Sequence, residues 1–221
     1  MKYSVKLLFS PAKWLCCLAY IVAIPIVMYV PTYYDFVNVS TLYFPFVGIV
    51  LFADISLLDS ANSSEEIVYL SNQKPISTFL LRYIITVILL LAYIICSNLI
   101  FRVIHFTQGS FLTEPISFLE YILIVTCSSL YIGSLAMLIS AVFNNVYIGF
   151  GCACVFWVYW NVNYEIQILI NPFPFIANPT FYEKPTTVLY ILTIVLTGFT
   201  CFSSSRSPFF IQDQIQKLKN R

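Results

Sequence analysis

Charged residues are scarce in this chain of 221 residues. Lysine, arginine, aspartate and glutamate make up 10 per cent of it, whereas a typical soluble domain contains about a quarter charged residues. Apolar residues make up 60 per cent, and the mean hydropathy is +0.86. A water-soluble fold cannot cover that much apolar surface, but a lipid bilayer can serve as its solvent. The composition therefore excludes an ordinary soluble domain and predicts a membrane protein.

The sequence also lacks the motifs of several enzyme classes. No GxxxxGK[ST] loop is present, so we expect that this chain does not hydrolyse ATP by itself. Neither GxSxG nor HExxH occurs, and His105 is the only histidine. The seven cysteines contain no CxxC pair and all lie in apolar stretches, as packing residues do. We expect no enzymatic activity, metal or cofactor in this chain, and no nucleic-acid partner.

One acidic pair invites comparison with a membrane enzyme. Glu65 and Glu66 are adjacent, as are the paired glutamates of intramembrane CAAX-type proteases. That chemistry also needs an arginine soon after the pair and histidines on neighbouring helices. Residues 67–70 are apolar or tyrosine, and His105 is expected on the opposite membrane face. The protease interpretation is therefore disfavoured.

What the sequence has in abundance is long apolar blocks separated by short polar joints. Blocks of about 17 residues or more are long enough to cross a bilayer as helices. They cover residues 14–30, 41–58, 79–101, 117–143, 146–162 and 186–202. Residues 163–185 contain four prolines, which fits a broken or re-entrant outer hairpin better than a span. We predict an all-α integral membrane protein with six transmembrane helices in one domain, residues 1–221.

Six spans place both termini on the same side of the membrane, and the basic residues indicate which side. With the termini in the cytoplasm, only Arg102 and Lys184 lie outside. The other nine basic residues lie inside, as the positive-inside rule requires. They are Lys2, Lys6, Lys13, Lys74, Arg82, Arg206, Lys217, Lys219 and Arg221. Frequent isoleucine, asparagine, tyrosine and phenylalanine are typical of an AT-rich bacterial genome, so we expect a bacterial plasma membrane.

The joint after the second block predicts a short amphipathic helix. Ser63 followed by Glu66 matches a capping box, and Glu65 and Glu66 complement the positive end of the helix dipole. The residues on one face of this helix are Ile67, Leu70 and Lys74. Pro75 is expected to end it, and a new helix is expected to start near residue 77 and to carry Arg82. Such a helix either lies at the membrane interface or docks onto a cytosolic partner.

This layout resembles the permease subunits of type-2 ATP-binding-cassette (ABC) transporters. In that family a glutamate, a leucine, a proline and a basic residue follow the second span, which Glu66, Leu70, Pro75 and Arg82 match. A second similarity is NPFPF at residues 171–175, which resembles the asparagine–proline element of the outer hairpin before the last span. The resemblance covers the whole chain in layout and these two short stretches in residues.

The resemblance implies a coupling mechanism and partners. Residues 63–74 would contact a separate ATP-binding cassette subunit, which would hold the ATP and magnesium. A second permease chain, alike or different, would face this one across a pathway. The resemblance also places Asn171, Pro172 and Pro174 in the outer hairpin or along a pathway.

Polar residues within the apolar blocks are further candidates. Asp54 lies within about a turn of the cytoplasmic end of its block, so the end-of-helix interpretation is favoured over a pathway role. Asn98 and Glu120 are expected at the outer edge. Small residues four positions apart allow close helix approach, and we interpret them mainly as packing. These pairs are Ser129 with Gly133, Ala136 with Ser140, and Gly149 with Ala153.

We therefore predict the permease subunit of an ATP-driven ABC exporter. The apolar, aromatic interior with few charges favours a hydrophobic or amphipathic cargo such as a peptide, lipid or drug. Export is expected because the short outer joints offer no docking site for a solute-binding protein. Two alternatives remain: a membrane-embedded partner or immunity protein without transport of its own, and a membrane enzyme.

Overall fold

The computed structural model describes residues 10–28, 31–58, 75–107 and 116–204, and all regular secondary structure in these ranges is helical. These ranges contain six long helices and two short ones. They are α2 (Pro11–Val27), α3 (Tyr33–Phe52), the 3₁₀ helix η1 (Ile55–Leu57), α6 (Pro75–Thr107), α7 (Phe118–Phe143), α8 (Val146–Val162), α9 (Pro174–Ala177) and α10 (Glu183–Ser204). The predicted all-α class is confirmed for the described residues.

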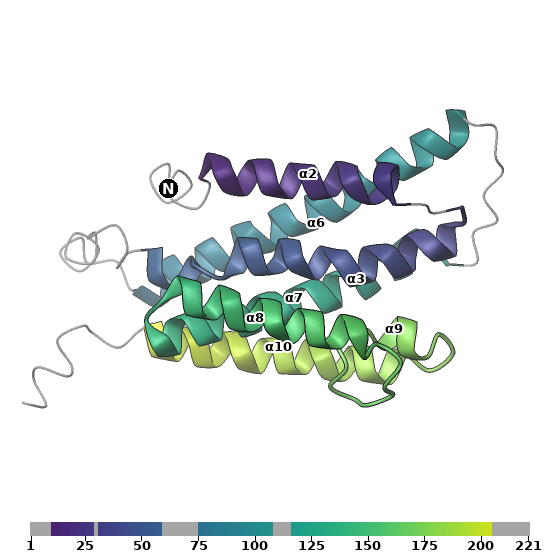
Figure 1. Cartoon of the computed structure of the whole chain (residues 1–221). Coiled ribbons are helices and arrows are strands. Elements are labelled where there is room, and N and C mark those ends of the chain that lie inside the picture. The colour runs from purple at the N-terminus through teal and green to yellow at the C-terminus, as the bar shows by residue number, and fades with distance from the viewer. Residues whose placement is uncertain (1–9, 29–30, 59–74, 108–115, 205–221) are drawn as a thin grey trace, which may run out of the picture.

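The six long helices form a bundle in which the chain reverses direction from each long helix to the next (Figure 1). The start of α2 and the end of α10 consequently lie at the same end of the bundle. We call this the Lys13 end and the opposite one the Arg102 end. α7 packs against α3, α8 and α10, whereas α2 packs chiefly against α3 and α6 on one side of the bundle.

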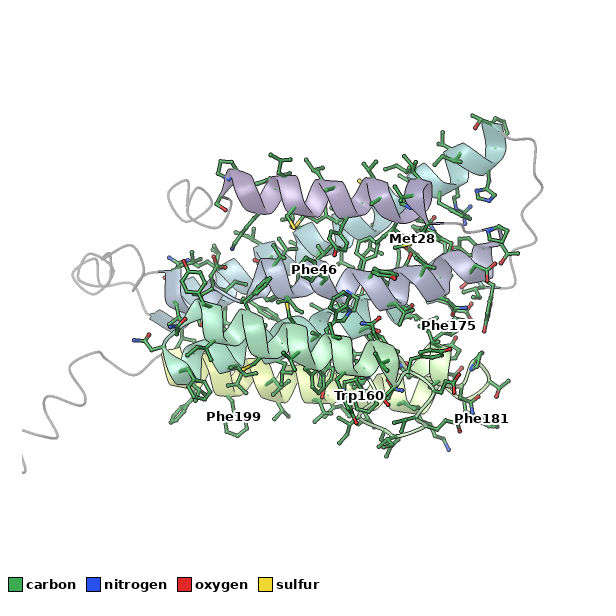
Figure 2. The ribbon with its side chains drawn as sticks, viewed as in Figure 1. Met28, Phe46, Trp160, Phe175, Phe181 and Phe199 are labelled. Carbon is green, nitrogen blue, oxygen red and sulfur yellow. The ribbon has the colours of Figure 1, made fainter. Side chains whose placement is uncertain are left out.

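Several helices are long and apolar enough to cross a membrane. Four candidate spans occur in the described residues: 33–57, 76–107, 118–143 and 183–203. α2 and α8 are apolar as well but have only 17 residues each. Large apolar side chains are exposed on these helices, and Phe199 of α10 points away from the bundle in Figure 2. These features are those of a helical membrane protein.

α10 illustrates how the bundle faces its surroundings. Thr186, Thr193 and Thr200 are buried, and each hydroxyl donates to the carbonyl four residues earlier. The opposite side of the helix exposes Ile194 and Phe199. A helix with its hydroxyls inside and its apolar side chains outside is stable in lipid rather than in water.

Several helix boundaries differ from the predicted ones: α6, for example, continues to Thr107 through the joint expected from Arg102, and two helix starts have a clear physical reason. The second apolar block was expected to start at residue 41, but α3 already begins at Tyr33. Thr32 caps this start by accepting from the Asp35 amide, and Tyr33 and Phe36 are buried, so tertiary packing recruits a stretch that is locally polar. α6 begins at Pro75 instead of near residue 77, because proline is well accommodated in the first turn of a helix.

The tight turn between α7 and α8 follows directly from two asparagines. Asn144 ends α7 in the left-handed conformation, with φ of 50°, which asparagine tolerates better than most residues. The side chain of Asn145 then accepts hydrogen bonds from the amides of Tyr147 and Ile148, which caps α8. The turn predicted at residues 144–145 is confirmed.

Small residues bring the central helices into close contact. A Cβ atom on Gly48 of α3 would overlap the Ser129 carbonyl oxygen of α7, and one on Gly133 would lie 3.1 Å from the Gly48 carbonyl oxygen. At the next interface, a Cβ on Gly149 of α8 would collide with Ser140 of α7. The packing interpretation of these small residues is confirmed.

Candidate functional site

An ion pair joins two elements at the Lys13 end of the bundle. Asp54 lies two residues after α3, and its carboxylate accepts from the Lys13 ammonium of α2 at 2.5 Å. Both side chains are largely enclosed, at 17 and 20 per cent exposure. Loss of either partner from such an enclosed pair would leave the other charge poorly compensated. Asp54 is therefore held by α2 at the end of its helix.

A buried polar cluster lies toward the Arg102 end, between α3 and α6. The amide nitrogen of Asn98 donates to the Tyr33 hydroxyl at 3.0 Å, and its amide oxygen accepts from Arg102 Nε at 2.9 Å. Asn98 and Tyr33 are fully buried. We call Tyr33, Asn98 and Arg102 the Tyr33 cluster. Its hydrogen bonds satisfy an amide that would be costly to leave unpaired inside the bundle.

Aromatic rings surround this cluster. The Arg102 guanidinium carbon lies 5.6 Å from the Tyr33 ring centroid and 5.9 Å from that of Phe118, within the range of cation–π attraction. Phe36 stacks on Phe101 with centroids 4.2 Å apart. Cation, amide and rings together fix the relative positions of α3, α6 and the start of α7.

Sequence reasoning found only part of the Tyr33 cluster. Asn98 was expected as an outer-edge group and Arg102 as one of two external cations. Their spacing of four residues puts them on one helix face, which is the signal that links them. Tyr33 is 65 residues from Asn98 and lies in a stretch expected to be a joint, so no local pattern connects them.

Asn171 organises the connection between α8 and α10. Its side chain is buried; the amide nitrogen donates to the carbonyls of Tyr164 and Ile166, and the amide oxygen accepts from the Phe173 amide, all at 2.8 Å. Pro172 and Pro174 are buried beside it, and Pro174 begins α9. In the predicted hairpin, the Asn171 side chain thus supplies hydrogen-bond partners to backbone groups that lie outside regular secondary structure.

The capping box predicted for Ser63 lies outside the described residues, but another one is present at the start of α7. The Glu120 carboxylate accepts from the Ser117 amide at 2.8 Å, and the Ser117 hydroxyl accepts from the Glu120 amide at 3.3 Å. Glu120, which was expected as an outer-edge polar group, thereby forms part of the N-terminal cap of α7.

Most of the predicted coupling residues lie outside the described part of the chain. These residues are Ser63, Glu65, Glu66, Ile67, Leu70 and Lys74. Pro75 is the first residue of α6, and Arg82, two turns further on, is only 3 per cent exposed. Arg82 therefore lies within the protein rather than on a lipid-facing surface.

The described residues contain no group of three or more histidine, cysteine, aspartate or glutamate side chains arranged to hold a metal ion. The seven cysteines carry free thiols. The polar contacts described above, Lys13 with Asp54 and Asn98 with Tyr33, instead join separate elements of the bundle. No protein-family model, curated protein or solved structure matches the chain.

Proposed function

We propose that this chain is the transmembrane permease subunit of an ATP-driven ABC exporter in a bacterial plasma membrane. The observation that carries the proposal is the direction of the helices. α3 runs toward the Lys13 end and α6 leaves from it, so the end of α3 and the start of α6 both lie at the end where α2 begins (Figure 1). A docking helix between α3 and α6 in the chain would face the cytoplasm together with nine of the eleven basic residues.

The proposed topology has six spans with both termini in the cytoplasm. α2 and α8 have 17 residues each, which is about 25 Å at about 1.5 Å per residue. The hydrocarbon core of a bilayer is about 30 Å thick, so each of the two helices falls slightly short of it. Both run beside longer helices along the bundle, and exposed apolar residues cover their outer faces.

A re-entrant hairpin after α8 makes up for the shortness of this helix. α7 and α8 meet at the Asn144 turn, and α8 is nine residues shorter than α7, or about 14 Å at the α-helical rise. The segment that follows exposes Ile166, Ile168, Leu169 and Ile170. Their apolar side chains suit the depth of the outer leaflet at which α8 ends.

Non-helical backbone can lie at membrane depth only if its polar groups are satisfied within the protein. The three hydrogen bonds of Asn171 serve this purpose for residues 164, 166 and 173. Backbone bonds from Ile166 to Asn163 and from Asn171 to Ile168 add to them. These bonds order part of the hairpin backbone, and its exposed residues include Glu165 and Gln167 beside the apolar ones, so the proposed hairpin would sit near the outer membrane interface.

The proposed partners are a separate ATP-binding subunit, which holds ATP and magnesium, and a second permease chain. Energy would enter through residues 63–74 and reach the bundle through the adjoining ends of α3 and α6. The cargo would be hydrophobic or amphipathic, because aliphatic and aromatic side chains build the interior of the described bundle and the Lys13–Asp54 and Arg102–Asn98 groups there are engaged with each other.

Co-purification in mild detergent with candidate ATP-binding subunits tests the proposal. The native chain is expected to retain such a subunit, and Glu66→Lys is expected to lose it by reversing a charge in the docking helix. Glu183→Lys is the matched control, because it makes the same change at an exposed position at the Arg102 end. Failure of the native chain to retain any ATP-binding subunit would contradict the proposal and favour a membrane-embedded partner or immunity protein.

A further inference from the structure

We propose that the Lys13–Asp54 ion pair is a latch that holds α2 over the seam between α3 and α6, and that breaking the pair lets α2 move away from this seam. The proposal needs no ATP-binding subunit and stands apart from the proposed transport function. It rests on the position of the pair, on the peripheral place of α2 and on the two different ends of this helix.

α2 is the least embedded of the long helices at the side of the bundle. It packs chiefly on α3 and α6 and lies along the outside of both (Figure 1). One face of it is apolar and exposed, including Leu15 and Val22. The other face buries Cys17, Ile21 and Ile24 against the seam. Apolar packing between helices loses little when lipid tails replace the neighbouring helix, so it holds α2 only weakly.

The two ends of α2 are held differently. At the start, Lys13 reaches the carboxylate of Asp54, which is 41 residues away in the chain. Near the other end, Pro25 lies inside the helix. Proline supplies no amide hydrogen, so the Ile21 carbonyl loses its normal partner there and the helix bends more easily. The polar anchor is therefore at the Lys13 end and the flexible point at the Arg102 end.

The ion pair supplies the directional contact that apolar packing lacks. Removing one partner of an enclosed pair leaves the other charge uncompensated in a poorly solvated site, which strongly destabilises that arrangement. The isolated charge regains solvation when α2 swings outward and water reaches Asp54. Motion about Pro25 would displace the Lys13 end of α2 most and would expose Cys17, one turn further along the helix.

Alkylation of Cys17 in liposomes measures this opening. The Cys17 side chain is 1 per cent exposed in the structure. When the other six cysteines are replaced by alanine, Cys17 is therefore expected to react slowly with N-ethylmaleimide. Asp54→Asn and Lys13→Met are each expected to raise the rate at least about tenfold, which corresponds to about 1.4 kcal/mol. Lys13→Arg, which keeps the charge, is expected to react like the parent.

The charge-swapped chain, Lys13→Glu with Asp54→Lys, is expected to bring the rate back to within a few fold of the parent. Lys184→Met removes an exposed charge at the other end and is expected to change nothing. Parental rates in both single variants, or a swapped chain as reactive as they are, would overturn the latch. Aggregation of Asp54→Asn in detergent would also overturn it, since the pair would then be a requirement for folding.

Discussion

Asn98 and Asn171 are buried asparagines that serve different purposes. Asn98 joins two helices through side-chain partners, Tyr33 and Arg102. Asn171 pairs only with backbone groups of its own connection. An amide suits both positions because it donates and accepts at the same time without carrying a charge into the bilayer. At the scale of single residues, these two amides hold separate parts of the described bundle together.

The hydrogen bond between Tyr33 and Asn98 predicts a measurable coupling energy. We expect Tyr33→Phe and Asn98→Leu each to lower the free energy of unfolding in mixed micelles. In a double-mutant cycle their effects should be non-additive by about 0.6 to 1.7 kcal/mol, the range found for hydrogen bonds between membrane helices. Tyr34→Phe is the control, because that hydroxyl makes no hydrogen bond within the described ranges. Additive effects would contradict an energetic link between α3 and α6 at this point.

At the scale of helices, contact distance is set by small residues on α3, α7 and α8. Gly48 and Gly133 lie in the α3–α7 contact, and Gly149 lies in the α7–α8 contact. Gly151, two residues after Gly149, has open space where a Cβ would be added. Two glycines of one helix therefore differ in a way that composition cannot reveal.

This difference predicts opposite outcomes for the same substitution. Gly149→Val is expected to lower stability by at least about 1–3 kcal/mol, because the added methyl groups would overlap Ser140 and force α8 away from α7. Gly151→Val is expected to be neutral or slightly stabilising, since its side chain would project into open space. Thermal unfolding in detergent measures both. If both variants lost the same amount of thermal stability, the effect would come from the backbone conformation of glycine and not from the contact between α7 and α8.

At the scale of the whole molecule, the bundle has two chemically different ends. The Lys13 end carries the enclosed ion pair, whereas the Arg102 end carries the Tyr33 cluster and the Asn171 connection. Apolar side chains are exposed along the helices between these ends. Such a molecule is expected to sit across a bilayer with the Lys13 end toward the cytoplasm.

Cysteine labelling in intact cells tests this orientation. In a cysteine-free background, Lys184→Cys is expected to react with a membrane-impermeant maleimide added from outside, because this exposed residue lies at the Arg102 end. Ser10→Cys is expected to react only after the membrane is permeabilised, since it precedes α2 at the Lys13 end. Labelling of both sites in intact cells, or of Ser10→Cys alone, would contradict the proposed topology.

Features that depend on neighbours in the chain were already determined by the sequence. The apolar blocks predicted helices for a bilayer, because hydrophobicity over about 20 residues is enough to identify them. Asn144 and Asn145 predicted their turn, and the small pairs predicted close packing. In each case the physical cause acts within a few residues, so it can be read from a short stretch.

Only the tertiary structure decided which distant groups meet. Lys13 and Asp54 are 41 residues apart, and Tyr33 and Asn98 are 65 apart, so neither pair leaves a local pattern. The early start of α3 has the same origin, because burial of Tyr33 and Phe36 against other helices outweighs the polar residues around them. A charged or amide side chain is costly to leave unpaired inside a membrane protein, and the assembled bundle determines which partner Asp54 and Asn98 meet.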